Sequence, residues 1–222
     1  MGVGVRLYLD TADRVAAEDL LATGLFAGVT TNPTILRRAE RGVADIADIH
    51  RWALAAGARE VFFQAWGEDT ATLVKRGTEL RALGEEVVVK LVASRAGAAA
   101  CAALATEGVP TLLTAVYDPV QAVVAAAAGA TYVAPYLGQL AEAGHDAVGA
   151  VVAMQEALAA TGSPTRILLA SIRDVASVVE LARHGVAHFT LGPAVAEQLF
   201  TDERTARAVQ VFEDAVRETT GR

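Results

Sequence analysis

The sequence predicts an α/β protein built as a single (β/α)8 TIM barrel with an additional C-terminal helix. Eight short segments rich in β-branched and aromatic residues alternate with longer, Ala-rich segments whose apolar residues recur every three or four positions. The short segments are almost continuously apolar, which is typical of parallel strands buried on both faces. Eight such units in 222 residues favour a closed barrel over the alternative, an open doubly wound sheet.

The expected strands lie at 5–11, 27–31, 60–66, 86–92, 109–116, 131–136, 165–171 and 187–192. The stretch 201–220 follows the eighth unit and predicts an extra helix, with a plausible cap and acidic first turn at Thr201, Asp202 and Glu203. The chain contains no recognisable domain linker, so residues 1–222 are expected to form one domain.

The composition narrows the classes of partner. Hydrophobic residues make up 53% of the chain, charged residues make up 20%, and the net charge is -7. This charge argues against general binding to nucleic acids or anionic membranes, which requires a basic surface. It leaves room for a phosphorylated small molecule in a locally cationic pocket. The charge-free run 119–141 is interrupted by Gly129, Pro135 and Gly138, so we expect a buried helix and a buried strand rather than a membrane span.

The single cysteine, Cys101, excludes an intrachain disulfide and lies among alanines, so we expect a buried structural thiol in a reducing, cytoplasmic protein. The first ten residues resemble a strand rather than a secretory signal. The four histidines do not form a recognisable metal-binding pattern, and no metal site is predicted; these residues are His50, His145, His184 and His188.

Polar residues recur at the carboxyl ends of seven expected strands, on a face that is otherwise apolar. Side chains two positions apart in a strand point the same way, and in a parallel barrel the carboxyl ends meet at one mouth, where active sites lie. An ordinary strand-terminal polar group is the simpler interpretation for several of them taken singly. By this parity the residues that face the mouth are Asp10, Thr30 with Asn32, Gln64, Lys90, Thr114, Tyr136 and Ser171.

Lys90 is the most informative of these residues. The chain contains two lysines, and arginine supplies its other 17 fixed positive side chains, 19 less 2. Burial disfavours the ammonium form and lowers the pKa of a lysine, and a neutral amine can attack a carbonyl to form a Schiff base. Arginine stays protonated and cannot do this. A structural ion pair between Asp10 and Lys90 remains an alternative, whereas Lys75 is expected on a solvated helix.

Several motifs together resemble the small transaldolase family, and most closely its fructose-6-phosphate aldolase branch. They span nearly the whole chain in order, and the most specific combination is GVTTNP followed by a lysine in the fourth strand. The segments are LYLDTAD near the start, GVTTNPTIL at 28–36, Lys90, TLLTAVY at 111–117, YVAPY at 132–136 and LLASIRD at 168–174.

The resemblance implies a class I aldolase-type barrel without a metal or organic cofactor. Lys90 corresponds to the Schiff-base lysine and Asp10 to the acid that handles substrate hydroxyls and proton transfer. Asn32 corresponds to the asparagine that positions the dihydroxyacetone unit. Three residues correspond to the groups that hold or activate a catalytic water, namely Gln64, Thr114 and Tyr136. Two correspond to part of the phosphate site, namely Ser171 and Arg173.

Two residues favour the aldolase branch, because transaldolases proper typically carry glutamate in place of Gln64 and the larger ones carry phenylalanine in place of Tyr136. Two departures concern the substrate. Val92 and Ser94 replace the proline and threonine usual after the lysine, although Ser94 keeps a hydroxyl for the substrate site. Gln139 stands where relatives often have a phosphate-binding arginine, and it offers hydrogen bonds without charge.

The expected substrate is therefore a sugar or sugar phosphate. Alternatives are a true transaldolase, a different lysine-dependent barrel such as a deoxyribose-phosphate aldolase or a pyridoxal-binding enzyme, and a non-catalytic scaffold. The segment 201–220 resembles the helix that packs against a neighbouring subunit in small transaldolases, so the resemblance also implies a homo-oligomer.

Overall fold

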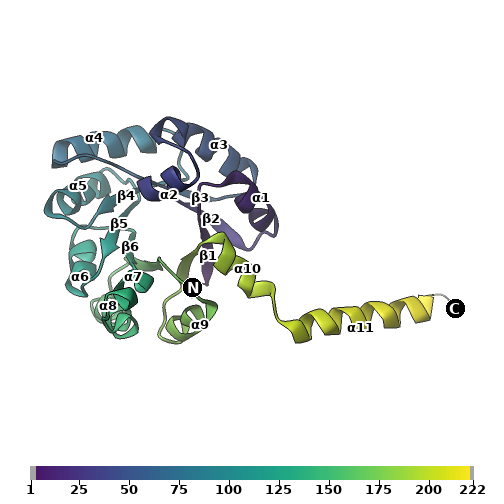
Figure 1. Cartoon of the computed structure of the whole chain (residues 1–222). Helices are drawn as coiled ribbons and strands as arrows, with labels where there is room; N and C mark the ends of the chain where they lie inside the picture. The colour runs from purple at the N-terminus through teal and green to yellow at the C-terminus, as the bar shows by residue number, and fades with distance from the viewer. Residues whose placement is uncertain (1–3, 221–222) are drawn as a thin grey trace.

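The computed structural model describes residues 4–220 and shows eight parallel strands closed into a barrel in sequence order (Figure 1). Each strand lies within two residues of its expected range, so the predicted barrel is confirmed. The strands are β1 (Arg6–Asp10), β2 (Phe26–Thr30), β3 (Glu60–Gln64), β4 (Val87–Val92), β5 (Thr111–Val116), β6 (Tyr132–Pro135), β7 (Arg166–Leu169) and β8 (His188–Leu191).

Helices surround the barrel. Aspartates cap five of them, with each side chain accepting a backbone N–H in the first turn, and these caps are Asp13, Asp69, Asp146, Asp174 and Asp202. The helices are α1 (Arg14–Ala22), α2 (Pro33–Arg38), α3 (Ile46–Ala55), α4 (Thr70–Arg81), α5 (Arg95–Thr106), α6 (Val120–Ala127), α7 (Leu137–Glu142), α8 (Ala147–Ala160), α9 (Val175–Arg183), α10 (Pro193–Glu197) and α11 (Glu203–Thr220), with short 3-10 turns η1 (Val43–Asp45) and η2 (Gln198–Phe200).

The apolar side chains form two separate cores. The larger one lies between the strands and the helices and includes the predicted buried thiol of Cys101, which is fully buried. The smaller one fills the inside of the barrel, where the alternating strand residues converge, and includes Tyr8, Phe62, Val88, Leu112, Tyr132, Ala134 and Leu168. The barrel is therefore a packed core that closes the mouth from below.

Glycine is required where β2 approaches β3. A Cβ atom at Gly28 would lie 1.8 Å from the Glu60 carbonyl oxygen, far inside van der Waals contact. The adjoining register between β1 and β2 shifts between Leu7 and Tyr8. The absence of a side chain at Gly28 thus lets the GVTT strand close against its neighbour and brings the following residues to the mouth.

The amino end of the barrel holds a buried polar cluster. The Tyr8 and Tyr132 hydroxyls donate to Glu60, at 2.5 and 3.0 Å, and Arg6 forms an ion pair with the same carboxylate at 3.3 Å. His188 is 1% exposed, its ring packs edge-on against Tyr132, and its Nε2 atom has no hydrogen-bond partner among the described residues. The cluster lies at the end opposite the mouth. In barrels of this kind, residues at that end contribute to stability rather than to catalysis.

The charge-free run 119–141 forms α6 followed by β6, as predicted, but the expectation of a buried helix is wrong. Helix α6 buries Ala122 and Ala125, whereas Val120, Val123 and Val124 are 40–59% exposed. Within residues 4–220, no helix is both long enough and apolar enough to cross a bilayer.

Helix α11 extends away from the barrel (Figure 1) and has no buried residue. Its predicted cap is confirmed, since the Asp202 carboxylate accepts the Arg204 and Thr205 backbone N–H groups at 2.9 and 3.0 Å. Four of its apolar side chains are more than half exposed, namely Val209, Val211, Phe212 and Val216. Among residues 4–220, no segment packs against this helix closely enough to bury any of its residues.

Candidate active site

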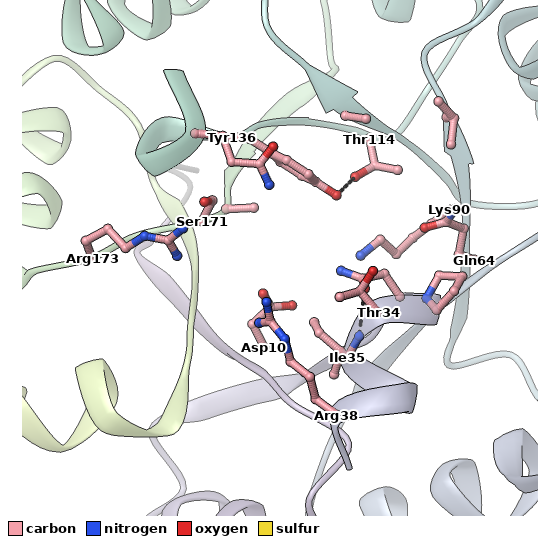
Figure 2. Close-up of a pocket in the computed structure, with 16 residues that line it drawn as sticks. Asp10, Thr34, Ile35, Arg38, Gln64, Lys90, Thr114, Tyr136, Ser171 and Arg173 are labelled. Atoms are coloured by element: carbon pink, nitrogen blue, oxygen red, sulfur yellow. Dashed lines mark hydrogen bonds between the residues drawn. The ribbon is translucent and has the colours of Figure 1, made fainter. Parts of the chain in front are cut away.

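The carboxyl ends of the strands surround a cavity of about 340 Å³ at the mouth of the barrel (Figure 2). The sequence-predicted residues that line it are Asp10, Asn32, Gln64, Lys90, Thr114, Tyr136, Gln139, Ser171 and Arg173. Strands, a helix and a loop distant in sequence thus contribute polar side chains to one hollow, as the parity of the strands predicted for most of them.

Lys90 projects from β4 into this cavity and is 4% exposed. Its Nζ atom donates to the Thr31 carbonyl oxygen at 2.7 Å, and this is its one hydrogen bond among the residues described. Burial lowers the pKa of Lys90, opposed by the charge of Asp10. The direct ion pair with Asp10 that the sequence left open does not form, so the amine is held by a neutral acceptor in a poorly solvated place.

Asp10 faces the same cavity from β1. Its Oδ1 atom accepts a 2.6 Å hydrogen bond from the Thr30 hydroxyl, which also lies 2.7 Å from the Thr190 hydroxyl. Burial raises the pKa of Asp10, and the charge of Lys90, the Thr30 hydrogen bond and the charge of Arg38 oppose that rise. The carboxyl group therefore has a fixed orientation and a pKa set by opposing effects.

Tyr136 and Thr114 form a hydroxyl pair on the side of the cavity opposite Asp10 (Figure 2). Their oxygen atoms lie 2.8 Å apart, and burial raises the pKa of Tyr136, so the phenol remains protonated at neutral pH. Ala115, the next residue, has φ +57° where the register between β5 and β6 is irregular. This bulge places a strained backbone beside the pair, as is common next to active sites. Gln64 faces the same hollow from β3.

Asn32 is held by the start of α2. Its Oδ1 atom accepts the Ile35 backbone N–H at 2.9 Å, and Pro33 occupies the first helical position. The TTNP sequence thus ends a strand and begins a helix within one turn. Because the oxygen of the side chain is used as the cap, its amide N–H groups are the ones available to the cavity.

Ser171 reaches the cavity by a route that the strand parity did not predict. Leu168 in β7 and Ala170 just after it face the barrel interior, whereas Leu169 faces the helices. Alternation would put Ser171 on the same face as Leu169, away from the mouth, so strand parity was the wrong reason to place Ser171 there. The strand ends at Leu169, and Ser171 has φ +58°, which turns the chain. Its carbonyl oxygen accepts the Gly138 backbone N–H at 2.8 Å, which holds the turn.

Arg173 follows this turn, and its guanidinium donates to Glu142 at 2.9 Å. Its side chain lies so close to Gly138 that an added Cβ atom there would come within 2.9 Å of the Nε atom, so glycine leaves the room that Arg173 occupies. Gln139 lies nearby on α7, and its Oε1 atom accepts a 2.7 Å hydrogen bond from the Tyr117 hydroxyl. Gln139 therefore presents amide N–H groups at the position where relatives often carry an arginine.

Two predicted substrate-binding residues lie outside the cavity lining. Thr30 is 1% exposed beneath Asp10, where it orients the carboxylate. Ser94 is exposed at the start of α5, and its hydroxyl accepts the Gly97 backbone N–H at 3.1 Å. Val92, at the position where relatives carry proline, does line the cavity. Lys75 is exposed on α4, as predicted.

Arg38 also lines the cavity (Figure 2) but was not predicted from the sequence. A usable signal exists, because Thr34 and Arg38 are four residues apart on α2 and so share a face of the helix. The eighth strand was predicted, but its Thr190, which joins Thr30 beneath Asp10, was not among the predicted site residues. The remaining cavity-lining residues that were not predicted are Pro33, Thr34, Ile35, Ala115 and Ala170.

Comparison with known proteins finds relatives that span nearly the whole chain. The family model described as transaldolase/fructose-6-phosphate aldolase matches residues 7–221. A "Probable transaldolase" from Coprothermobacter proteolyticus is 36% identical over 209 residues, which cover 94% of this chain and 94% of the relative. A "Probable transaldolase" from Caulobacter sp. strain K31 is 35% identical over 212 residues, with 94% of each chain covered. One from Methanococcus maripaludis strain C7 is 31% identical over 208 residues, covering 94% and 95%.

A solved structure supports the fold at greater distance. A crystal structure from Burkholderia cenocepacia J2315, named as a "putative phosphonomutase", superimposes with a TM-score of 0.58 at 17% identity and covers 97% of this chain and 93% of that one. At this identity the likeness concerns the fold alone. The family model and the relatives, in contrast, extend over nearly the whole sequence, and the chain belongs to the transaldolase/fructose-6-phosphate aldolase family.

Proposed function

We propose that this protein is a class I aldolase or transaldolase that forms a Schiff base between Lys90 and a ketose, and that the transferred or released unit is dihydroxyacetone. The observation that carries the proposal is the buried Lys90 amine, with a lowered pKa and a neutral hydrogen-bond acceptor, inside a polar cavity. A free base amine attacks a carbonyl carbon, whereas an ammonium group cannot.

The proposed reaction begins when Lys90 adds to the C2 carbonyl of the ketose. Loss of water gives an iminium, whose positive charge withdraws electrons. Removal of the C4 hydroxyl proton breaks the C3–C4 bond, an aldehyde leaves, and the electron pair of that bond forms an enamine on the lysine. The iminium is itself the electron acceptor, so the cycle requires no metal or organic cofactor. Protonation of the enamine and hydrolysis then release dihydroxyacetone, or an aldehyde captures the enamine instead.

The side chains around the amine support these steps. The protonated Tyr136 phenol is paired with Thr114, which lies on β5 next to the strand of Lys90. We assign to this pair, with Gln64, the holding of the water that relays protons. Asp10, oriented by Thr30, is assigned to the hydroxyl groups of the substrate. Asn32 is assigned to the dihydroxyacetone unit, because its N–H groups are free to donate. Ser171, Arg173 and Gln139 are assigned to the distal, anionic end of the substrate. Ser94 is assigned to the turn between β4 and α5 that follows Lys90.

Two outcomes of the enamine remain as candidates. Gln64 with Tyr136 favours the aldolase outcome, because a phenol can hydrogen-bond to the water needed for hydrolysis. The names of the relatives favour transfer to a second aldehyde. A product assay separates them: free dihydroxyacetone from fructose 6-phosphate alone supports aldolase action, whereas glyceraldehyde 3-phosphate released only with an acceptor aldose phosphate supports transaldolase action.

Trapping of the intermediate tests the proposal itself. Borohydride reduction in the presence of fructose 6-phosphate or dihydroxyacetone is expected to attach the sugar carbons to Lys90, identified by peptide mass spectrometry. Lys75 provides an internal control, because it is an exposed lysine outside the cavity. An adduct on Lys75 alone, or full turnover by a Lys90→Met variant, would refute the mechanism.

We also propose that the protein assembles as a homo-oligomer through α11, whose apolar side chains stay exposed in the part of the chain that the structure describes. A cytoplasmic location accords with the one buried, unpaired thiol, Cys101.

A further inference from the structure

The cavity has two arginines on different sides of its rim. Arg38 belongs to the last turn of α2, and Arg173 follows the turn after β7. Figure 2 shows both side chains directed toward the mouth, with Asp10 and Ser171 also in view. In a chain with a net charge of -7, two cations at one mouth mark a locally positive entrance to the site.

Arg173 is not fully available to a ligand. Its guanidinium is bound to Glu142 at 2.9 Å through both the Nε and Nη2 atoms. That carboxylate neutralises much of the charge that Arg173 offers to the cavity. Gln139, the nearest polar side chain on α7, contributes amide donors and no charge, and its oxygen is already occupied by Tyr117. An anion bound only between Arg173 and Gln139 would meet a single positive charge, and that charge is already paired with Glu142.

Arg38 is differently placed. Among the residues described, its guanidinium takes part in none of the ion pairs or side-chain hydrogen bonds. Six other arginines pair with carboxylates on their own helix or turn, namely Arg14, Arg41, Arg51, Arg76, Arg204 and Arg217. The charge of Arg38 acts on the cavity, since it works to lower the pKa of Asp10. The five N–H donors of a guanidinium suit the oxygens of a phosphate group.

We propose that Arg38 is a phosphate-binding residue of this site, and that it holds the phosphate of the ketose phosphate together with Arg173 and Ser171. This inference rests on the proposed function and adds the residue that sets its preference for phosphorylated substrates. Arg38 contributes a positive charge to the cavity, whereas the charge of Arg173 is largely balanced by Glu142. The competing explanation is that Arg38 serves only to adjust the ionisation of Asp10.

The experiment compares two ketones with the Arg38→Gln variant. Fructose 6-phosphate carries the phosphate, whereas dihydroxyacetone presents the same carbonyl unit without it. The concentration of each that gives half-maximal borohydride trapping on Lys90 is measured by intact mass. Arg37→Gln is the matched control, because Arg37 is the exposed neighbour on the same helical turn and does not line the cavity.

Loss of a charge-assisted hydrogen bond typically costs about 10- to 100-fold in binding. We expect the half-maximal concentration of fructose 6-phosphate to rise by about that factor in Arg38→Gln, at least tenfold more than the change for dihydroxyacetone. Arg38→Lys should recover part of the loss, and inorganic phosphate should compete with fructose 6-phosphate more weakly in Arg38→Gln than in the parent and in Arg37→Gln.

Equal effects on the two ketones, with a displaced pH profile for both, would overturn the inference in favour of the Asp10 explanation. An equal effect of Arg37→Gln would overturn it in favour of a general surface field. Both results differ from failure of the proposed function, in which the parent protein forms no adduct on Lys90 with either ketone.

Discussion

The Thr30 hydroxyl donates a 2.6 Å hydrogen bond to the Asp10 carboxylate and lies 2.7 Å from the Thr190 hydroxyl, which joins three neighbouring strands beneath the cavity. A hydrogen bond to the ionised form lowers the pKa of a carboxyl group. Thr30 thus both orients Asp10 and opposes the effect of its burial.

Replacement of Thr30 by valine keeps the shape and removes this bond. The pKa of Asp10 should rise. The rate of any step that needs the carboxylate should therefore begin to fall at a higher pH on the acidic side of the profile. We expect kcat to fall about tenfold, a loss typical of a displaced proton-transfer group. A pH profile of kcat checks this, and a uniform loss with an unchanged profile would show that Thr30 is only structural.

Lys90 variants test the chemistry of the amine. Lys90→Met and Lys90→Arg should both abolish borohydride trapping, because the guanidinium of arginine stays protonated. In the parent, the lowered pKa of Lys90 places the rise in trapping rate with pH below the ordinary lysine value of 10.5. Lys75→Met is the matched control and should trap like the parent. Trapping that rises only near the ordinary value would contradict the desolvated amine.

The pair of Tyr136 and Thr114 predicts how the enamine is partitioned. Tyr136→Phe removes the 2.8 Å partner of Thr114 and the donor to a bound water. Release of free dihydroxyacetone should fall by about 10²- to 10⁴-fold, the usual contribution of a general acid or base, while transfer to an added aldehyde should fall less. Measuring both products in one reaction gives the ratio. An unchanged ratio would place the catalytic water elsewhere.

His188 predicts the acid stability of the barrel. Burial, with the nearby charges of Arg166 and Arg6, lowers the pKa of His188 to about 4, and Glu60 acts in the opposite direction. The unfolded chain takes up this proton near pH 6.5, so stability is present above that pH and is lost as the pH falls toward 4. Each pKa unit corresponds to about 1.4 kcal/mol, so the loss is on the order of 3 kcal/mol.

The free energy of unfolding in urea, measured from pH 7 to pH 4, tests this for His188→Phe, which keeps a ring against Tyr132. The parent should lose more stability than the variant across this range. The remaining loss, common to both proteins, comes from their other titrating groups. Parallel curves for the two proteins would show that His188 titrates normally.

Helix α11 predicts the state of assembly. Phe212 is 69% exposed on a helix without buried residues, so Phe212→Asp should leave the barrel folded and weaken contacts between subunits. Light scattering is expected to show a parent particle of several chains and a smaller particle for the variant, with unchanged circular dichroism. A monomeric parent would contradict the proposed oligomer.

The sequence predicted the barrel and most of its mouth because both depend on a local rule, the alternation of side chains along buried strands. Lys90, Asp10, Gln64, Thr114 and Tyr136 follow that rule and line the cavity. The same rule was wrong for Ser171, since β7 ends at Leu169 and a positive φ angle redirects the chain. No pattern of apolar residues signals such a turn.

Other parts depend on contacts between distant segments. The role of Thr30 requires Thr190, which becomes its neighbour only when β8 pairs with β1 to close the barrel. Arg38 lies on a helix that folds over the mouth, so a search restricted to strand ends omits it. The ion pair between Arg173 and Glu142 likewise joins the turn after β7 to α7. The sequence alone contains the residues but not these distances.

The apolar side chains inside the barrel separate two sets of ionisable groups. Phe62, Val88 and Leu112 lie between Lys90 with Asp10 at one end and Glu60 with His188 at the other. The two ends can therefore change independently: acid resistance can be adjusted at the amino end while the optimum pH of the reaction stays the same. For protein engineering, substitutions at the amino end can therefore adjust stability in acid, and substitutions at the mouth can adjust catalysis.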